Sequence, residues 1–101
     1  MEFIQIIEYQ TSKPDEVQAI GEAFRDKRMA DADDTPPIQI IQVQDKDREN
    51  TYMTIVHFVS EEAAMENSQR EDTGAFAAQM MALCDGPPKF YNLDVLMKYS
   101  S

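Results

Sequence analysis

The chain of 101 residues contains one cysteine, one histidine, three glycines and no tryptophan. A single cysteine excludes a disulfide within the chain, and Cys84 with His57 cannot supply the four ligands of a closed structural zinc site. The sequence has no internal repeat and no glycine-rich loop. Its apolar runs are far shorter than the ~20 residues of a membrane-spanning helix. We therefore expect one small domain, spanning residues 1–101, with no metal and no cofactor.

Basic residues are also scarce. Nine Lys and Arg stand against 19 Asp and Glu, which gives a formal net charge of −10. Nucleic acids and anionic membrane surfaces attract clusters of Lys and Arg, so this charge argues against both as partners. The sequence opens on Met1-Glu2-Phe3, without the basic segment that begins a signal peptide. We expect a cytoplasmic protein with an acidic surface.

Four segments are rich in the β-branched and aromatic residues of strands. They are residues 2–9, 38–44, 52–59 and 89–97. Two regions with helical patterns lie between them, one after the first strand and one after the third. The order βαββαβ predicts an α+β, ferredoxin-like domain, in which two helices cover one face of a four-stranded antiparallel sheet.

The helix boundaries carry signals of their own. Ser12 suits the N-cap of the first helix, and Pro14 suits its first turn. Ser60 suits the N-cap of the second helical region. Polar residues 69–72 interrupt this second region, and Thr73 suits the cap of a new piece. The second region is therefore expected to consist of two consecutive helices.

Alternation along the strands sorts their residues into two faces of the sheet. The aliphatic face carries Ile4, Ile6, Ile41, Val43, Met53, Ile55 and Leu93. The aromatic face carries Phe3, Tyr9, Tyr52, Phe58 and Phe90. We assign the aliphatic face to the helices. An apolar patch as large as the aromatic face marks an interface when it is left open, and we therefore expect a homodimer that pairs through the aromatic face of the sheet.

Three segments carry a resemblance to known proteins. They are Phe3-Ile4-Gln5-Ile6-Ile7, the passage from Tyr52 to Phe58-Val59-Ser60-Glu61-Glu62-Ala63, and Pro88-Lys89-Phe90-Tyr91-Asn92-Leu93-Asp94-Val95. These segments resemble the dimeric α+β barrel superfamily, which includes the antibiotic-biosynthesis-monooxygenase-like and stress-responsive barrel families. Two further segments, Asn67-Ser68 and Cys84-Asp85-Gly86-Pro87-Pro88, are similar in placement to those of a short actinobacterial-type branch of uncharacterised proteins.

The resemblance implies a homodimer with a ligand pocket between the sheet and the helices of each subunit. Some members of the superfamily oxidise polycyclic aromatic substrates with O₂ without metal or flavin, and one branch degrades haem. The chain departs from the haem branch, because it has no Trp, no His in the second helical region and no Asn in the first strand. Haem degradation is therefore not expected.

Several polar side chains stand on the otherwise apolar aromatic face. Two interpretations stay open: a pocket in which a few polar groups converge on a small apolar or aromatic ligand, and a hydrogen-bonded dimer interface. Asn67, at the break in the second helical region, would lie above the mouth of such a pocket or would satisfy the break itself. The expected ligand-binding residues are Gln5, Tyr9, Tyr52, Thr54, Phe58, Asn67 and Asn92.

His57 and Cys84 are the two residues that invite a catalytic role. Histidine is the natural general base near neutral pH. The alternation places His57 on the aliphatic face, however, and we expect a hydrogen-bonded structural role for it. Cys84 has no neighbouring cation in the sequence that would activate its thiol, and we expect a small buried residue.

Two functions remain on these grounds. The first is a homodimer that binds a small apolar ligand or serves another non-catalytic role. The second is a cofactor-independent monooxygenase-like enzyme, or an isomerase or cyclase, acting on an aromatic substrate that Gln5, Tyr52 and Asn92 would position, with His57. The sequence shows no recognisable proton-transfer pair, which favours the first function.

Overall fold

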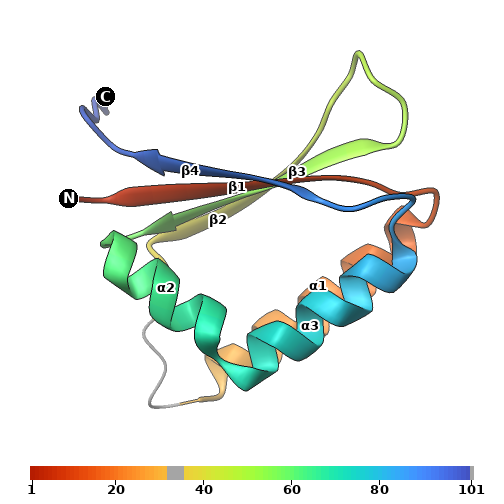
Figure 1. Cartoon of the computed structure of the whole chain (residues 1–101), viewed down its shortest axis with the longest axis horizontal. Helices are drawn as coiled ribbons and strands as arrows, with labels where there is room; N and C mark the ends of the chain where they lie inside the picture. Colours follow the sequence, from red (N-terminus) through yellow and green to blue (C-terminus); the bar gives the residue numbers. More distant parts are fainter. Residues whose placement is uncertain (32–35, 101) are drawn as a thin grey trace.

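The computed structural model describes residues 1–31 and 36–100, and within them the elements follow the predicted order (Figure 1). They are β1 (Phe3–Gln10), α1 (Pro14–Met29), β2 (Gln39–Gln44), β3 (Thr51–Phe58), α2 (Glu61–Gln69), α3 (Glu71–Leu83) and β4 (Lys89–Asp94). The strands form one antiparallel sheet in the order β2-β3-β1-β4, with the helices on one side of it. The predicted α+β, ferredoxin-like fold is confirmed. No helix in this part of the chain is long and apolar enough to cross a bilayer.

The entry to α1 differs from the prediction. Lys13 is the N-cap residue and makes no side-chain capping bond, and Pro14 opens the helix. The buried Thr11 hydroxyl accepts a hydrogen bond from the Lys13 N–H at 3.0 Å and donates one to the Leu83 carbonyl at 2.6 Å. The prediction of Ser12 as N-cap is wrong, because Thr11 fixes the turn before α1 and ties it to the end of α3.

The second helical region consists of two helices, as predicted, and Ser60 caps the first with a 3.1 Å hydrogen bond. Arg70 alone separates α2 from α3, so the prediction that Thr73 restarts the helix is wrong. The Arg70 guanidinium donates 3.0 Å hydrogen bonds to the carboxylates of Asp72 and Asp31. The hydrogen bonds from Arg70 lower the pKa of Asp72 to about 2. Charge-assisted bonds therefore hold this junction in place of a Thr cap.

Strand β4 ends at Asp94, three residues before the predicted end. The Val95 N–H still donates a 3.0 Å bond to the Glu2 carbonyl, but β1 begins at Phe3 and offers no further ladder partner. The tail beyond that bond leaves three large apolar side chains 85–90% exposed, those of Leu96, Met97 and Tyr99.

The aromatic face of the sheet points toward the helices, so the predicted assignment of the two faces is wrong. Phe3 and Phe58 are cross-strand partners, and both are buried with Ala64 of α2. At the other end of the sheet, Tyr9 and Val17 of α1 are each 3% exposed. Alternation sorts strand residues into two sets but does not say which set meets the helices. Here α2 presents small alanines, and large rings fill the remaining distance.

The aliphatic face is the one that the helices leave open. Ile41, Val43 and Leu93 are 37–43% exposed on this face. Ile6 and Ile55, at its centre, are cross-strand partners and are half-buried. The sheet of a single copy therefore has one face toward the helices and one apolar face toward solvent.

Candidate functional site

The side of the sheet that faces the helices is well covered only at its two ends. Phe3 and Phe58 are buried beneath α2 at one end, and Tyr9 is buried at the other. Between these ends, Ile40 and Phe90 are each 54% exposed. The half-buried residues of this central stretch are Gln5, Ile7, Thr54 and Val56. The centre of this face therefore remains accessible in a single copy of the chain.

The arrangement of the helices explains this gap in coverage. Helix α2 lies against β1 and β3, whereas α1 and α3 contact each other (Figure 1). The rings of Phe24 and Phe76 stack between α1 and α3, with centroids 4.4 Å apart and an interplanar angle of 8°. These two phenylalanines therefore pack on each other, and helix α2 provides the core contact with Phe3 and Phe58.

A cleft of about 220 Å³ lies at the Tyr9 end of the sheet, between the start of α1 and the strands β1, β2 and β3. We call it the Tyr9 cleft. Its lining residues are Tyr9, Thr11, Pro14, Val17, Gln18, Gln42, Val43, Gln44 and Tyr52. Aromatic rings and a few amide and hydroxyl groups in one concavity are the usual features of a site for a small organic molecule.

Tyr9 is a buried residue of the Tyr9 cleft whose hydroxyl is hydrogen-bonded. It lies opposite Tyr52 on the neighbouring strand, and their rings stack with centroids 5.8 Å apart at an angle of 21°. Gln42 Nε2 donates a 2.7 Å hydrogen bond to the Tyr9 hydroxyl oxygen, and Thr54 is a second hydrogen-bond partner of that hydroxyl. Burial raises the pKa of Tyr9 above its ordinary value of 10.0. The hydroxyl therefore keeps its proton and remains a hydrogen-bond donor at neutral pH.

A second polar pair lies between β1 and β4, on the same face of the sheet as Tyr9. Gln5 and Asn92 are cross-strand partners of β1 and β4, and Gln5 Nε2 donates a 3.1 Å hydrogen bond to Asn92 Oδ1. Asn92 is exposed and Gln5 is half-buried. Each amide keeps further donors or acceptors for another molecule, because an amide side chain has four such positions.

The structure divides the predicted ligand-binding residues into three groups. Tyr9 and Tyr52 line the Tyr9 cleft and Thr54 borders it, whereas Gln5 and Asn92 form the separate pair across β1. Phe58 belongs to the core under α2. Asn67 Oδ1 accepts a long 3.5 Å bond from the Thr73 hydroxyl, at the junction of α2 and α3.

Among the lining residues that the sequence reasoning missed, Gln42 is the one that is hydrogen-bonded to Tyr9. It lies opposite Thr54 of β3, on the face that meets the helices. Alternation placed Ile41 and Val43 on the aliphatic face, and Gln42 lies between them in the same strand. Continuing the alternation along β2 was the signal that would have identified it.

His57 lies on the open face, away from the Tyr9 cleft. Its Nε2 is 2.5 Å from Glu2 Oε1, and the same carboxylate accepts 3.1 and 3.2 Å hydrogen bonds from Lys98. Hydrogen bonds from Lys98 and then His57 lower the pKa of Glu2. This arrangement is that of a hydrogen-bonded histidine between β3 and β1, although its structural role stays a prediction.

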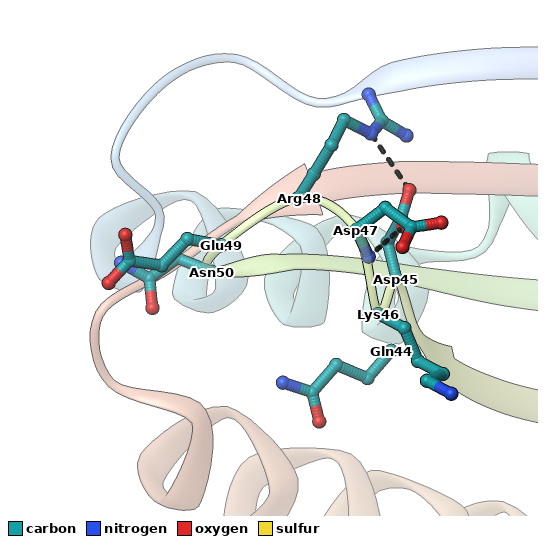
Figure 2. Close-up of a pocket in the computed structure, with 7 residues that line it drawn as sticks. All are labelled: Gln44, Asp45, Lys46, Asp47, Arg48, Glu49 and Asn50. Carbon is teal, nitrogen blue, oxygen red and sulfur yellow. Dashed lines mark hydrogen bonds and ion pairs between the residues drawn. The ribbon is translucent and has the colours of Figure 1, made fainter.

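A second hollow, of about 590 Å³, lies over the turn between β2 and β3 and is lined by residues 44–50 (Figure 2). Arg48 crosses this turn and binds Asp45 at 2.8 Å, and it also reaches Glu8 on β1 at 3.3 Å. The hydrogen bond from Arg48 lowers the pKa of Asp45. Arg48 and Asp45 therefore bind each other, which makes the turn a weaker candidate than the Tyr9 cleft.

Cys84 and the acidic side chains offer no further chemistry in the described structure. Burial raises the pKa of the half-buried Cys84 thiol, which makes the reactive thiolate scarcer at neutral pH. Among residues 1–31 and 36–100, no group of three or more His, Cys, Asp and Glu side chains is placed to hold a metal ion.

Comparisons with known proteins identify the fold. No protein-family model matches the chain, and no curated protein matches its sequence. Solved structures match over nearly the whole chain. The cofactor-independent oxygenase SnoaB from Streptomyces nogalater, as the N63A mutant, has a TM-score of 0.81 at 12% identity and covers 99% of this chain and 98% of its own. Rv0793 from Mycobacterium tuberculosis has a TM-score of 0.79 at 15% identity and covers 99% and 100%.

A third similar structure comes from Caulobacter crescentus and carries a provisional assignment as an antibiotic biosynthesis monooxygenase. Its TM-score is 0.80 at 16% identity, and the match covers 95% of this chain and 91% of the other. Structural similarity at this level of sequence identity establishes the fold alone. The function has to be inferred from the residues of the site. The predicted resemblance is confirmed at the level of the fold, while the actinobacterial-type branch stays a prediction. The chain has the fold of the antibiotic biosynthesis monooxygenases.

Proposed function

We propose that the protein is a homodimer that binds a small apolar or aromatic ligand in the Tyr9 cleft of each subunit. The observation that supports this most strongly is the stacked pair of Tyr9 and Tyr52 beside hydrogen-bonding groups, on a sheet face that the helices cover incompletely. Flat apolar surface gives a ligand its binding energy, and a few fixed polar groups give it one orientation.

The dimer would form through the open aliphatic face of the sheet, in place of the aromatic face predicted from the sequence. This face carries the exposed Ile41, Val43 and Leu93. Two acidic residues lie on the same face, and each has basic partners: Glu8 pairs with Arg48, and Glu2 contacts His57 and Lys98. A chain of net charge −10 would repel a second copy over most of its surface. The locally balanced, apolar sheet face is where that repulsion is weakest.

A direct binding experiment tests the ligand site. Isothermal titration calorimetry tests three two-ring compounds: coumarin, 2-naphthol and 2-naphthoate. At least one of them should bind saturably, with one molecule bound per subunit. Tyr52→Ala should weaken that binding about tenfold or more, since it removes one ring of the stack. The dimer should persist in this variant, with a light-scattering mass of twice the 11.6 kDa chain. Failure of all three compounds to bind would refute the proposal.

Cofactor-independent oxidation of an aromatic substrate is a second candidate, which the likeness to the fold of the S. nogalater oxygenase favours. Such a reaction needs a group that removes a proton from the substrate. In the described part of the chain, the lining of the Tyr9 cleft contains no His, Asp, Glu or Lys. The binding role is therefore the better supported. An oxygen electrode decides between them: sustained O₂ uptake with 2-naphthol, lost in Tyr52→Ala, would establish the oxygenase.

A further inference from the structure

The lining of the Tyr9 cleft is uncharged, although 28% of the residues of the chain are charged. Within the described part of the chain, the nine residues that line it are tyrosines, glutamines, a threonine, a proline and valines. An ionised ligand loses its hydration on entering a cleft, and it needs an opposite charge there to offset the loss. The Tyr9 cleft supplies no such charge, so its composition selects an uncharged ligand.

The volume of the Tyr9 cleft limits the size of the ligand. Pockets for drug-sized molecules usually enclose roughly 300–1,000 Å³, whereas this cleft has about 220 Å³. The stack of Tyr9 on Tyr52 gives it one flat wall. A compound of one or two rings fits these dimensions, and a larger fused-ring system exceeds them.

The hydrogen bonds of Tyr9 limit the polarity of the ligand. The Gln42 amide nitrogen can only donate, so its 2.7 Å bond occupies a lone pair of the Tyr9 oxygen. Thr54 is the second partner of this hydroxyl, and its hydrogen bond lowers the pKa of Tyr9, as a donor to the phenol oxygen does. The hydroxyl proton of Tyr9 is then left for an acceptor on a ligand. A ligand group that meets the Tyr9 hydroxyl is consequently bound best if it accepts a hydrogen bond.

We infer that the Tyr9 cleft takes an uncharged compound of one or two rings with a carbonyl-type acceptor, and that Gln42 determines this preference by holding Tyr9 as a donor. The inference rests on the proposed ligand-binding function and names the ligand class of that site. Gln42 acts through Tyr9 and is in this sense a specificity-determining residue.

The test compares coumarin, which has a carbonyl acceptor and no donor, with 2-naphthol, which has a hydroxyl donor, and with the anion 2-naphthoate. In the wild-type protein, coumarin should bind about five- to tenfold more tightly than 2-naphthol, the range that one net hydrogen bond supplies. The anion should bind more weakly than both. Calorimetry on the full chain measures all three dissociation constants.

Variants then assign the preference to Gln42. Gln42→Leu should bring the coumarin and 2-naphthol affinities to within about twofold of each other, because the freed Tyr9 oxygen can accept as well as donate. Gln42→Met repeats the change with an unbranched side chain, in case leucine disturbs β2. The matched control is Gln69→Leu at the exposed end of α2, which should keep the wild-type ratio.

The outcomes separate this inference from the function on which it rests. Tighter binding of 2-naphthol or 2-naphthoate than of coumarin, abolished by Tyr52→Ala, would overturn the ligand class and leave the proposed function standing. A full coumarin preference in both Gln42 variants would overturn the role of Gln42. Absence of binding by every compound would overturn the proposed function itself.

Discussion

His57 Nε2 lies 2.5 Å from Glu2 Oε1, and this contact joins β3 to the residue that precedes β1 on the open face of the sheet. Lys98 completes the cluster by binding the same carboxylate from the C-terminal tail. The cluster therefore fixes both ends of the chain at one corner of the sheet, where Figure 1 places the two termini.

Replacement of Glu2 by glutamine should destabilise the protein only where Glu2 is ionised. The pKa of Glu2 lies below its ordinary value of 4.5, because of hydrogen bonds from Lys98 and then His57. A carboxyl with a lowered folded-state pKa stabilises the fold above its unfolded pKa, and the effect is lost as pH falls through the folded value. Thermal melts should show a lower Tm for Glu2→Gln at about pH 7 and a smaller difference near about pH 3. Equal differences at both pH values would contradict the assignment.

Tyr9 should make the stability of the protein depend on pH in the alkaline range. Burial raises the pKa of Tyr9 above 10.0, so the unfolded chain loses this proton at a lower pH than the folded chain. The stabilisation is complete below the unfolded pKa and declines as pH rises through the folded value. Tyr9→Phe should therefore flatten the fall of Tm above about pH 10. Spectrophotometric titration of phenolate should at the same time lose its latest-titrating component.

An acidic side chain on the open face should break the dimer. Ile41→Asp places a charge at a 40% exposed site of β2, where the monomer tolerates it but an apolar interface does not. Light scattering at micromolar concentration should then give one 11.6 kDa chain in place of two. The control, Met81→Asp, alters a side chain of α3 that is 56% exposed, and it should leave the mass unchanged. A monomeric wild type would contradict the dimer directly.

The order of elements was predictable from the sequence because it depends on local signals. Strand composition and the Ser60 cap gave β3 and the start of α2. The residues that fix the starts of α1 and α3 were not predictable, because Thr11 and Arg70 also bind partners distant in sequence, Leu83 and Asp31. Local propensity contains no information about such bonds.

The assignment of the two sheet faces was not predictable for the same reason, because it also depends on contacts between parts of the chain that are distant in sequence. Alternation correctly grouped Phe3 with Phe58 and Ile6 with Ile55, which the strand register confirms. Alternation does not say which group meets the helices, and the aliphatic choice was wrong because Phe3 and Phe58 pack with Ala64 of α2. The site residues depended on that choice. Tyr9 and Tyr52 lie on the same face under either assignment. The predicted assignment made that face the dimer interface, whereas in the structure these two residues line a cleft beside α1.

Two phenylalanine variants test which face of the sheet meets the helices. Phe58 is 4% exposed in the cluster under α2, whereas Phe90 is 54% exposed on the same face of the sheet. Truncating a buried phenylalanine costs about 3–5 kcal/mol, through lost transfer energy and a cavity. Phe58→Ala should therefore lower the free energy of unfolding by about that amount in urea titrations, and Phe90→Ala by less than about 1.5 kcal/mol. Both variants should remain dimeric while folded, since neither side chain lies on the open face. If the aromatic face were the dimer interface, Phe90→Ala would instead weaken dimerisation.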